Sequence, residues 1–157
     1  MSGNSKILRV LAFAWLSAPL AACTTAGSYF SPQASTDAAN LQAPAADAVA
    51  ADMVARLAEY VGPGTGTIVL KADNSAFAAA FDKHLREWGY AVDPAATGPK
   101  AIALAYTVDA LDGAAIARVS TSSVELARQY QATATGAVAS SPLSIMKRSE
   151  TSRGQGV

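Results

Sequence analysis

Cys23 is the residue in this sequence with the clearest chemical role. It is the only cysteine of the 157 residues, and it directly follows Leu20, Ala21 and Ala22. A leucine three positions before a cysteine, with small residues between them, is the pattern at which bacterial lipoproteins are processed. The thiol accepts a diacylglycerol group, and the peptidase needs small side chains next to its cut. We therefore predict that Cys23 is lipidated and that Leu20, Ala21 and Ala22 form the signal-peptidase recognition sequence.

The residues before Cys23 have the three parts of a secretory signal. Lys6 and Arg9 supply positive charge, residues 10–16 are apolar, and residues 17–22 are mostly small. The apolar run is shorter than the roughly 20 residues that a transmembrane helix needs. We predict that residues 1–22 are a signal peptide that is removed. Acyl chains on Cys23 would then hold the protein in the membrane, at about 0.8 kcal/mol per buried methylene. An ordinary signal peptide with a chance cysteine is the alternative, but a lone free thiol is unusual in an exported protein.

The net charge of the mature chain and the residue after Cys23 indicate which partners and which membrane to expect. Loss of residues 1–22 removes two of the 12 basic residues and none of the 12 acidic ones, which leaves a net charge of −2 with His84 neutral. Nucleic acid is therefore not expected as a partner, because phosphate binding needs a basic surface. The residue after the cysteine is Thr24 and not an aspartate, which favours transfer of a lipoprotein to the outer membrane. We expect a lipid-anchored protein on the periplasmic face of a Gram-negative outer membrane, with membrane lipid bound through the acylated Cys23.

Three other groups of residues resemble chemical sites without completing one. His84 is a possible general base or metal ligand, but it flanks the apolar face of a helix and the sequence supplies no partner for it. Asp109 and Asp112 resemble a calcium or acid–base pair, yet they fall at a strand end and in a turn, where aspartate is common. The glycine-rich residues 62–67 lack the Gly-Lys-Ser/Thr ending of a phosphate loop and lead into a strand. We expect no enzyme activity, no catalytic or metal-binding residue, no cofactor and no small-molecule substrate.

The apolar periodicity predicts two helices. Residues 24–44 are small and polar and read as a flexible tether, with a stretched length of about 70 Å. The helix expected at 45–61 has apolar residues every four positions, namely Val49, Met53, Leu57 and Val61. The helix expected at 75–88 has a second apolar face, made of Phe77, Phe81, Leu85 and Trp88. Asp73 or Asn74 is expected to cap it.

Strand patterns occupy most of the remaining chain. Residues 67–71 and 90–92 are short β-rich runs, and 102–108, 114–121 and 124–132 alternate between apolar and polar. Asp112-Gly113 predicts a hairpin between two of them. The fold expected is α+β, with two helices packed on one face of a small, mostly antiparallel sheet of four to five strands. The expected organisation is a signal peptide (1–22), a lipidated N-terminus and tether (23–44), a periplasmic domain (45–138) and a loose C-terminal tail (139–157).

The order of several short motifs gives a family resemblance. From residue 48 to residue 148, the chain resembles the conjugal transfer protein TrbH family. The motifs are Val61-Gly62-Pro63-Gly64-Thr65, then Phe77 and Phe81 followed by Leu85-Arg-Glu-Trp-Gly-Tyr-Ala-Val92, and later Ala105-Tyr106, Ala117-Arg118-Val119 and Ala127-Arg128-Gln-Tyr130.

The resemblance implies a role in plasmid conjugation. TrbH-like proteins are encoded with the mating-pair-formation apparatus, a type IV secretion system, and are taken as lipoprotein parts of its channel. The expected partners are other subunits of that channel, and the family supplies no catalytic residues. Two alternatives stay open at this point. One is an outer-membrane lipoprotein of another envelope assembly, such as a pilot or a lipid-transport accessory. The other is an enzyme acting on peptidoglycan or lipid, which convergent carboxylates in a cleft would favour.

Overall fold

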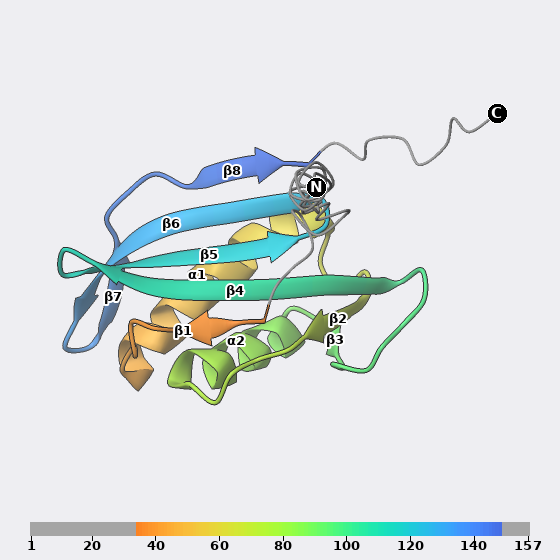
Figure 1. Ribbon diagram of the computed structural model, residues 1–157, viewed down its shortest axis with the longest axis horizontal. Helices are drawn as coiled ribbons and strands as arrows, with labels where there is room; N and C mark the ends of the chain where they lie inside the picture. Colours follow the sequence, from red (N-terminus) through yellow and green to blue (C-terminus); the bar gives the residue numbers. More distant parts are fainter. Residues whose placement is uncertain (1–33, 149–157) are drawn as a thin grey trace, which may run out of the picture.

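The structure is a computed structural model that describes residues 34–148 (Figure 1). These residues form two helices and eight strands around one hydrophobic core. In chain order the elements are β1 (Thr36–Asp37), α1 (Ala43–Val61), β2 (Thr67–Leu70), α2 (Ala76–Glu87), β3 (Ala91–Val92), β4 (Ala101–Leu111), β5 (Ala114–Thr121), β6 (Val124–Thr133), β7 (Gly136–Ala139) and β8 (Ser144–Lys147).

The sheet is larger and more mixed than the sequence patterns indicated. Its strands run in the order β3-β2-β4-β5-β6-β7, while β1 also pairs with β4 and β8 also pairs with β6. The pairs β2–β3, β2–β4 and β1–β4 are parallel, and the others are antiparallel. The expectation of a small, mostly antiparallel sheet of four to five strands is therefore wrong, although the α+β class is correct. In Figure 1 the long strands β4, β5 and β6 form a curled surface across one side of the molecule.

The missed parts of the sheet have physical causes. Strands β1, β7 and β8 have two to four residues each, too few to show an alternating pattern. The parallel pairing of β2 with β3 follows from the helix between them, because a strand–helix–strand crossover returns the chain in the same direction.

Three long antiparallel strands form the centre of the sheet, as the alternation predicted. Strands β4 and β5 meet at Asp112-Gly113, whose φ angles of 50° and 79° are those of a type I′ hairpin turn. Their inward side chains are fully or almost fully buried, and they include Tyr106, Val108 and Val119. One face of the sheet is thus closed by the helices, and the other carries the polar positions of the pattern.

Ordered strands reach past the domain boundaries expected from the sequence. Strand β1 lies within residues 23–44, and β8 lies within residues 139–157. Helix α1 begins at Ala43, two residues before the expected start, and a proline at its second position suits a first helical turn. Residues 34–42, which we call the N-terminal arm, are therefore part of the folded domain.

Both helices bury the apolar faces that their spacing predicted. In α1, Val49, Met53 and Leu57 are fully buried, and α1 contacts β5, β6, β7 and α2. Helix α2 is capped by Ser75, one residue after the expected candidates, because its hydroxyl accepts a hydrogen bond from the backbone N–H of Ala78 at 3.0 Å. Trp88 differs from the expectation, since it follows the last helical residue and is 42% exposed.

The glycine-rich segment after α1 is a turn, as expected. Gly62 adopts φ 80° and its N–H donates to the carbonyl of Ala58 at 3.0 Å, which ends the helix. A side-chain carbon at Gly66 would lie 2.6 Å from the carbonyl oxygen of Lys100, a separation that real contacts do not allow. Gly62 thus ends α1, and Gly66 allows the Lys100 carbonyl to approach closely at the entry into β2.

Three aromatic rings join α2 to the centre of the sheet. Phe77 and Phe81 stack with their centroids 5.4 Å apart, and Tyr106 meets them edge-on at 4.8 and 5.5 Å. All three side chains are almost completely buried. Contacts of this geometry contribute about 0.5–1.5 kcal/mol beyond the burial of apolar area.

We predict that Phe81→Ala lowers the free energy of unfolding by about 3–5 kcal/mol, because it removes a buried ring and leaves a cavity between Phe77 and Tyr106. Urea unfolding followed by circular dichroism measures the change. Trp88→Ala is the control, since it deletes a larger but partly exposed ring. An equal loss in both variants would contradict this description of the core.

Candidate functional site

The predicted lipidation residues lie outside the described part of the chain. Cys23 and the recognition residues Leu20, Ala21 and Ala22 precede Ala34, where the described structure begins. Their roles therefore remain predictions. The structure does describe how the chain that follows them joins the domain, which is through the N-terminal arm.

The N-terminal arm is held along one edge of the sheet. Strand β1 runs parallel to β4, with Thr36 opposite Thr107. The backbone N–H of Ser35 donates to the carbonyl of Lys71 at 3.2 Å, and the N–H of Ala38 donates to the carbonyl of Val108 at 2.8 Å. The arm thus contacts both β4 and the end of β2 before α1 begins.

The Asp73 carboxylate is the centre of a polar network beneath the arm. One oxygen accepts hydrogen bonds from the Ser75 hydroxyl (2.5 Å), the Ser75 N–H (3.1 Å) and the Tyr106 hydroxyl (2.8 Å). The other accepts the N–H of Asp37 at 2.6 Å. Burial alone would raise the pKa of Asp73, but these four hydrogen bonds outweigh it and hold the pKa below its usual range. The pKa of Tyr106 is raised, first by burial and then by its bond to Asp73.

Asp37 is the buried acid of the arm, with 8% of its surface exposed. Its Oδ2 accepts the N–H of Leu41 at 3.1 Å, whereas its Oδ1 is buried without a hydrogen-bond partner among the described residues. Burial raises the pKa of Asp37 above its usual value, the backbone N–H groups of Leu41 and Asn40 lower it, and the Asp73 charge raises it further. Asp37 and Asp73 are therefore two carboxyl groups in one site with opposite pKa shifts.

His84 lies in a charged cluster that joins the two helices. Its Nδ1 is 2.7 Å from Glu87 and its Nε2 is 3.1 Å from Asp47, which belongs to α1. Lys83 also contacts Asp47, at 3.1 Å. His84 thus lies beside the core, as its place along the apolar face of α2 indicated, with Glu87 of the same helix at one ring nitrogen and Asp47 of α1 at the other.

The other acidic candidates do not come together. Asp109 faces Arg118 across β4 and β5 at 3.5 Å, and both side chains are about half exposed. Asp112 occupies the hairpin turn with φ 50°. The two aspartates thus have separate structural roles.

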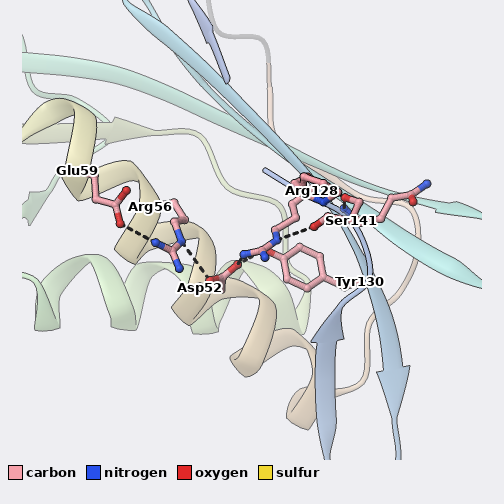
Figure 2. A network of polar contacts seen from close by, with 8 residues as sticks. Asp52, Arg56, Glu59, Arg128, Tyr130 and Ser141 are labelled. Carbon is pink, nitrogen blue, oxygen red and sulfur yellow. Dashed lines mark hydrogen bonds and ion pairs between the residues drawn. The ribbon is translucent and has the colours of Figure 1, made fainter. Parts of the chain in front are cut away.

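A second polar network, around Asp52, joins α1 to β6 (Figure 2). Its carboxylate accepts the Tyr130 hydroxyl at 2.6 Å and the Arg128 guanidinium at 2.9 Å. Arg56 lies on its other side at 3.5 Å, and Arg128 also donates to the carbonyl of Ser141 at 3.1 Å. The network therefore fixes the chain after β7 as well as the helix.

The sequence contained a signal for the Asp52 network that the helical pattern hid. In β6, inward positions alternate through Val124, Leu126, Arg128 and Tyr130, so a cation falls on the buried face. A buried cation needs an anion across the interface. On α1, Asp52 lies beside the apolar stripe, and a helical pattern does not show which residue of the sheet lies opposite.

The surface of residues 34–148 has shallow hollows. A hollow of about 410 Å³ lies between β2 and α2, where Asp82 and Arg86 pair with each other at 2.8 Å. Within residues 34–148, no cluster of three or more histidine, cysteine or acidic side chains is suited to a metal ion. No helix in the same range has the length and hydropathy to cross a membrane.

Strand β8 forms an open edge of the sheet. Its four residues are all exposed, including Ile145 at 43% and Met146 at 53%, and within the described range β6 is its pairing partner. The N–H of Arg148 donates to the carbonyl of Ser123 at 2.8 Å, so residues 146 and 144 also direct their backbone groups toward β6. The backbone groups of Ile145 and Lys147 consequently point outward. The Lys147 amine lies 5.8 Å from the centre of the Tyr60 ring on α1.

Removal of the Tyr130 hydroxyl should show how much the Asp52 network contributes to stability. We predict that Tyr130→Phe lowers the free energy of unfolding by about 1.5–3 kcal/mol, the range for hydrogen bonds to charged groups. Tyr60→Phe is the matched control, because its ring contact with Lys147 is retained.

Tyr130→Phe should also change how the free energy of unfolding depends on pH in alkaline solution. Burial, and then the bond to Asp52, raises the pKa of Tyr130 above the ordinary 10.0. The folded state keeps a proton that the unfolded state releases, so stability should fall as pH rises above 10. Denaturant unfolding between pH 9 and 11 should show a shallower fall for Tyr130→Phe than for the unchanged chain, and identical slopes would contradict the pKa shift.

Comparison with known proteins places the chain in a family. Residues 25–149 match the family model described as conjugal transfer protein TrbH. The chain is 47% identical over 112 residues to a probable conjugal transfer protein TrbH of Sinorhizobium fredii, an alignment that covers 67% of this chain and 76% of that relative. No solved structure matches. The family assignment suggested by the motifs is thus confirmed, and the chain belongs to the TrbH family of conjugal transfer proteins.

Proposed function

We propose that this conjugal transfer protein is a lipid-anchored structural component of the mating-pair-formation apparatus at the outer membrane. The family membership supports a role in conjugation. The leucine, two alanines and cysteine at positions 20–23 support acylation. In this proposal Cys23 carries the lipid, the following residues set the reach, and the domain docks onto another subunit of the channel. Its contribution is positional and involves no reaction.

The N-terminal arm reduces the number of residues between Cys23 and the folded domain. Because Ala34 begins the described domain, the chain between Cys23 and Ala34 spans at most about 40 Å when stretched. A lipid-anchored domain would therefore remain close to the membrane surface, with its docking partner within that distance.

The open edge at β8 is the observation that carries the docking proposal. Ile145 and Lys147 present outward backbone groups, two residues apart, as a neighbouring strand requires. The side chain of Ile145 is apolar and exposed, so it offers a hydrophobic contact to an added strand. The ammonium of Lys147 favours an acidic residue in that strand. We assign the partner as an extended, apolar and acidic segment of another transfer protein.

Loss of the lipid should reduce plasmid transfer. We predict that Cys23→Ser, supplied to a deletion strain, restores transfer poorly although the protein is exported and folded, because a hydroxyl does not replace the thiol as acyl acceptor. Mating frequency, labelled palmitate incorporation and membrane fractionation are measured together. Deletion of residues 25–33 is a second variant, which keeps the lipid and the arm but removes the reach. Normal transfer by both variants at normal protein levels would refute the positional role.

A change at the β8 edge should separate docking from anchoring. We predict that Ile145→Pro lowers plasmid transfer while the protein stays acylated. The N–H of Ile145 faces away from β6, so its loss leaves the β6–β8 pairing intact and removes a hydrogen bond only from an added strand. Ile145→Lys tests the same contact without a proline. Leu111→Lys is the control, because Leu111 is similarly exposed at 48% on the β4–β5 hairpin. Equal transfer by the Ile145 and Leu111 variants would exclude β8 as the docking edge.

A further inference from the structure

We propose that Asp37 and Asp73 form a proton-binding site that controls the attachment of the N-terminal arm to the domain. The site contains a buried, unpartnered oxygen, Asp37 Oδ1, on the element that connects the domain to the preceding chain. It therefore links the protonation of one side chain to the position of the arm.

The hydrogen bonds decide which carboxyl group takes the proton. Asp73 accepts four hydrogen bonds from Ser75, Tyr106 and the backbone of Asp37, and all of them favour its ionised form. Asp37 accepts the N–H of Leu41 on Oδ2, which leaves Oδ1 as the site for a proton. A protonated Oδ1 removes the repulsion between the two carboxylates.

Among residues 34–148, no cation is one of the groups that influence the Asp37 carboxyl. The titratable groups that face it are Asp73, from the β2–α2 connection, and Tyr106 of β4 through its bond to Asp73. On the arm itself, the backbone N–H groups of residues 39–41 are the favourable dipoles. An ionised Asp37 is thus desolvated beside a second anion, a state that weakens the docked arm.

The sign of the pH effect follows from this arrangement. The docked arm holds the Asp37 proton more tightly than the released arm, in which aspartate titrates near its usual value of 3.8. Attachment is therefore strongest in acid, and it weakens as the pH rises from about 4 through the docked pKa of Asp37. Asp73 acts in the opposite direction, but below its usual pKa, so the two effects occupy different pH ranges.

Release of the arm is a local event. Besides the bond from Asp37 to Asp73, the arm is held by the β1 pairing with β4, the backbone bonds of Ser35, Ala38 and Ala39, the bond from the Tyr106 N–H to the Ser35 hydroxyl, and the burial of Leu41. Helix α1 is held separately by its fully buried stripe. Segments with few tertiary contacts open without global unfolding. Detachment would therefore lengthen the chain between the membrane and the domain and leave the core intact.

Amide exchange on the full chain in detergent micelles tests the proposal. The N–H groups of Asp37 and Leu41 are both donors in the site, and the N–H of Val119 on β5 reports the core. With intrinsic exchange rates corrected, protection at Asp37 and Leu41 should fall as the pH rises above about 4, while protection at Val119 stays constant. The carboxyl-carbon shift of Asp37 should titrate above 3.8 and that of Asp73 below it. The same pH dependence at all three amides, or Asp37 titrating at or below 3.8, would overturn the proposal.

Two variants and one control sharpen the test. In Asp37→Asn the amide imitates the protonated acid, so the arm should stay protected at pH 7 and its pH dependence should vanish. Asp73→Asn should reduce arm protection at every pH, because it weakens four hydrogen bonds. Asp109→Asn is the matched control, since it changes an exposed aspartate on β4 and should leave the profile unaltered. Lower arm protection in Asp37→Asn than in the unchanged chain at pH 7 would refute proton control even if Asp73→Asn fails to fold.

Discussion

The carboxylate of Asp73 joins three parts of the chain that the strand ladders connect only weakly. It accepts hydrogen bonds from the start of α2 through Ser75, from the central strand β4 through Tyr106, and from the arm through the backbone of Asp37. Tyr106 in turn places its ring against Phe77 and Phe81. The seating of α2 on the sheet and the path of the arm therefore depend on one half-buried acceptor, whose removal would leave several donors unsatisfied.

Much of the central fold was predictable because its elements are long enough to show a period. The stripe of Val49, Met53 and Leu57 and the alternation in β4, β5 and β6 each repeat several times, so sequence alone located both helices and the three long strands. The β-rich runs at 67–71 and 90–92 also located the short strands β2 and β3. The hairpin at Asp112-Gly113 was predictable because its dihedral angles suit those two residue types. Trp88 was misplaced because helical spacing continued one residue past the last turn.

The short strands and the polar networks could not be predicted in the same way. The short strands β1, β7 and β8 show no alternating period, and the pairing of β1 and β8 depends on which strand edges the long strands leave open. The contacts of Asp52 with Arg128 and Tyr130 link positions more than 70 residues apart. Such pairs are decided by the packing of α1 on β6, which no local pattern encodes. The lipidation motif is the opposite case, since it is read locally and lies before the described residues.

The path of the arm has a mechanical consequence. Tension entering the domain at Ala34 would load the Ser35 bond, the short β1–β4 ladder and the Asp37–Asp73 contact before it reached α1. Those few bonds are far weaker than the packing of α1, so they would yield first. Unwinding residues 34–42 would supply about 30 Å of slack. Under tension the arm would thus detach first and lengthen the link between the preceding chain and the domain, while the core remains folded.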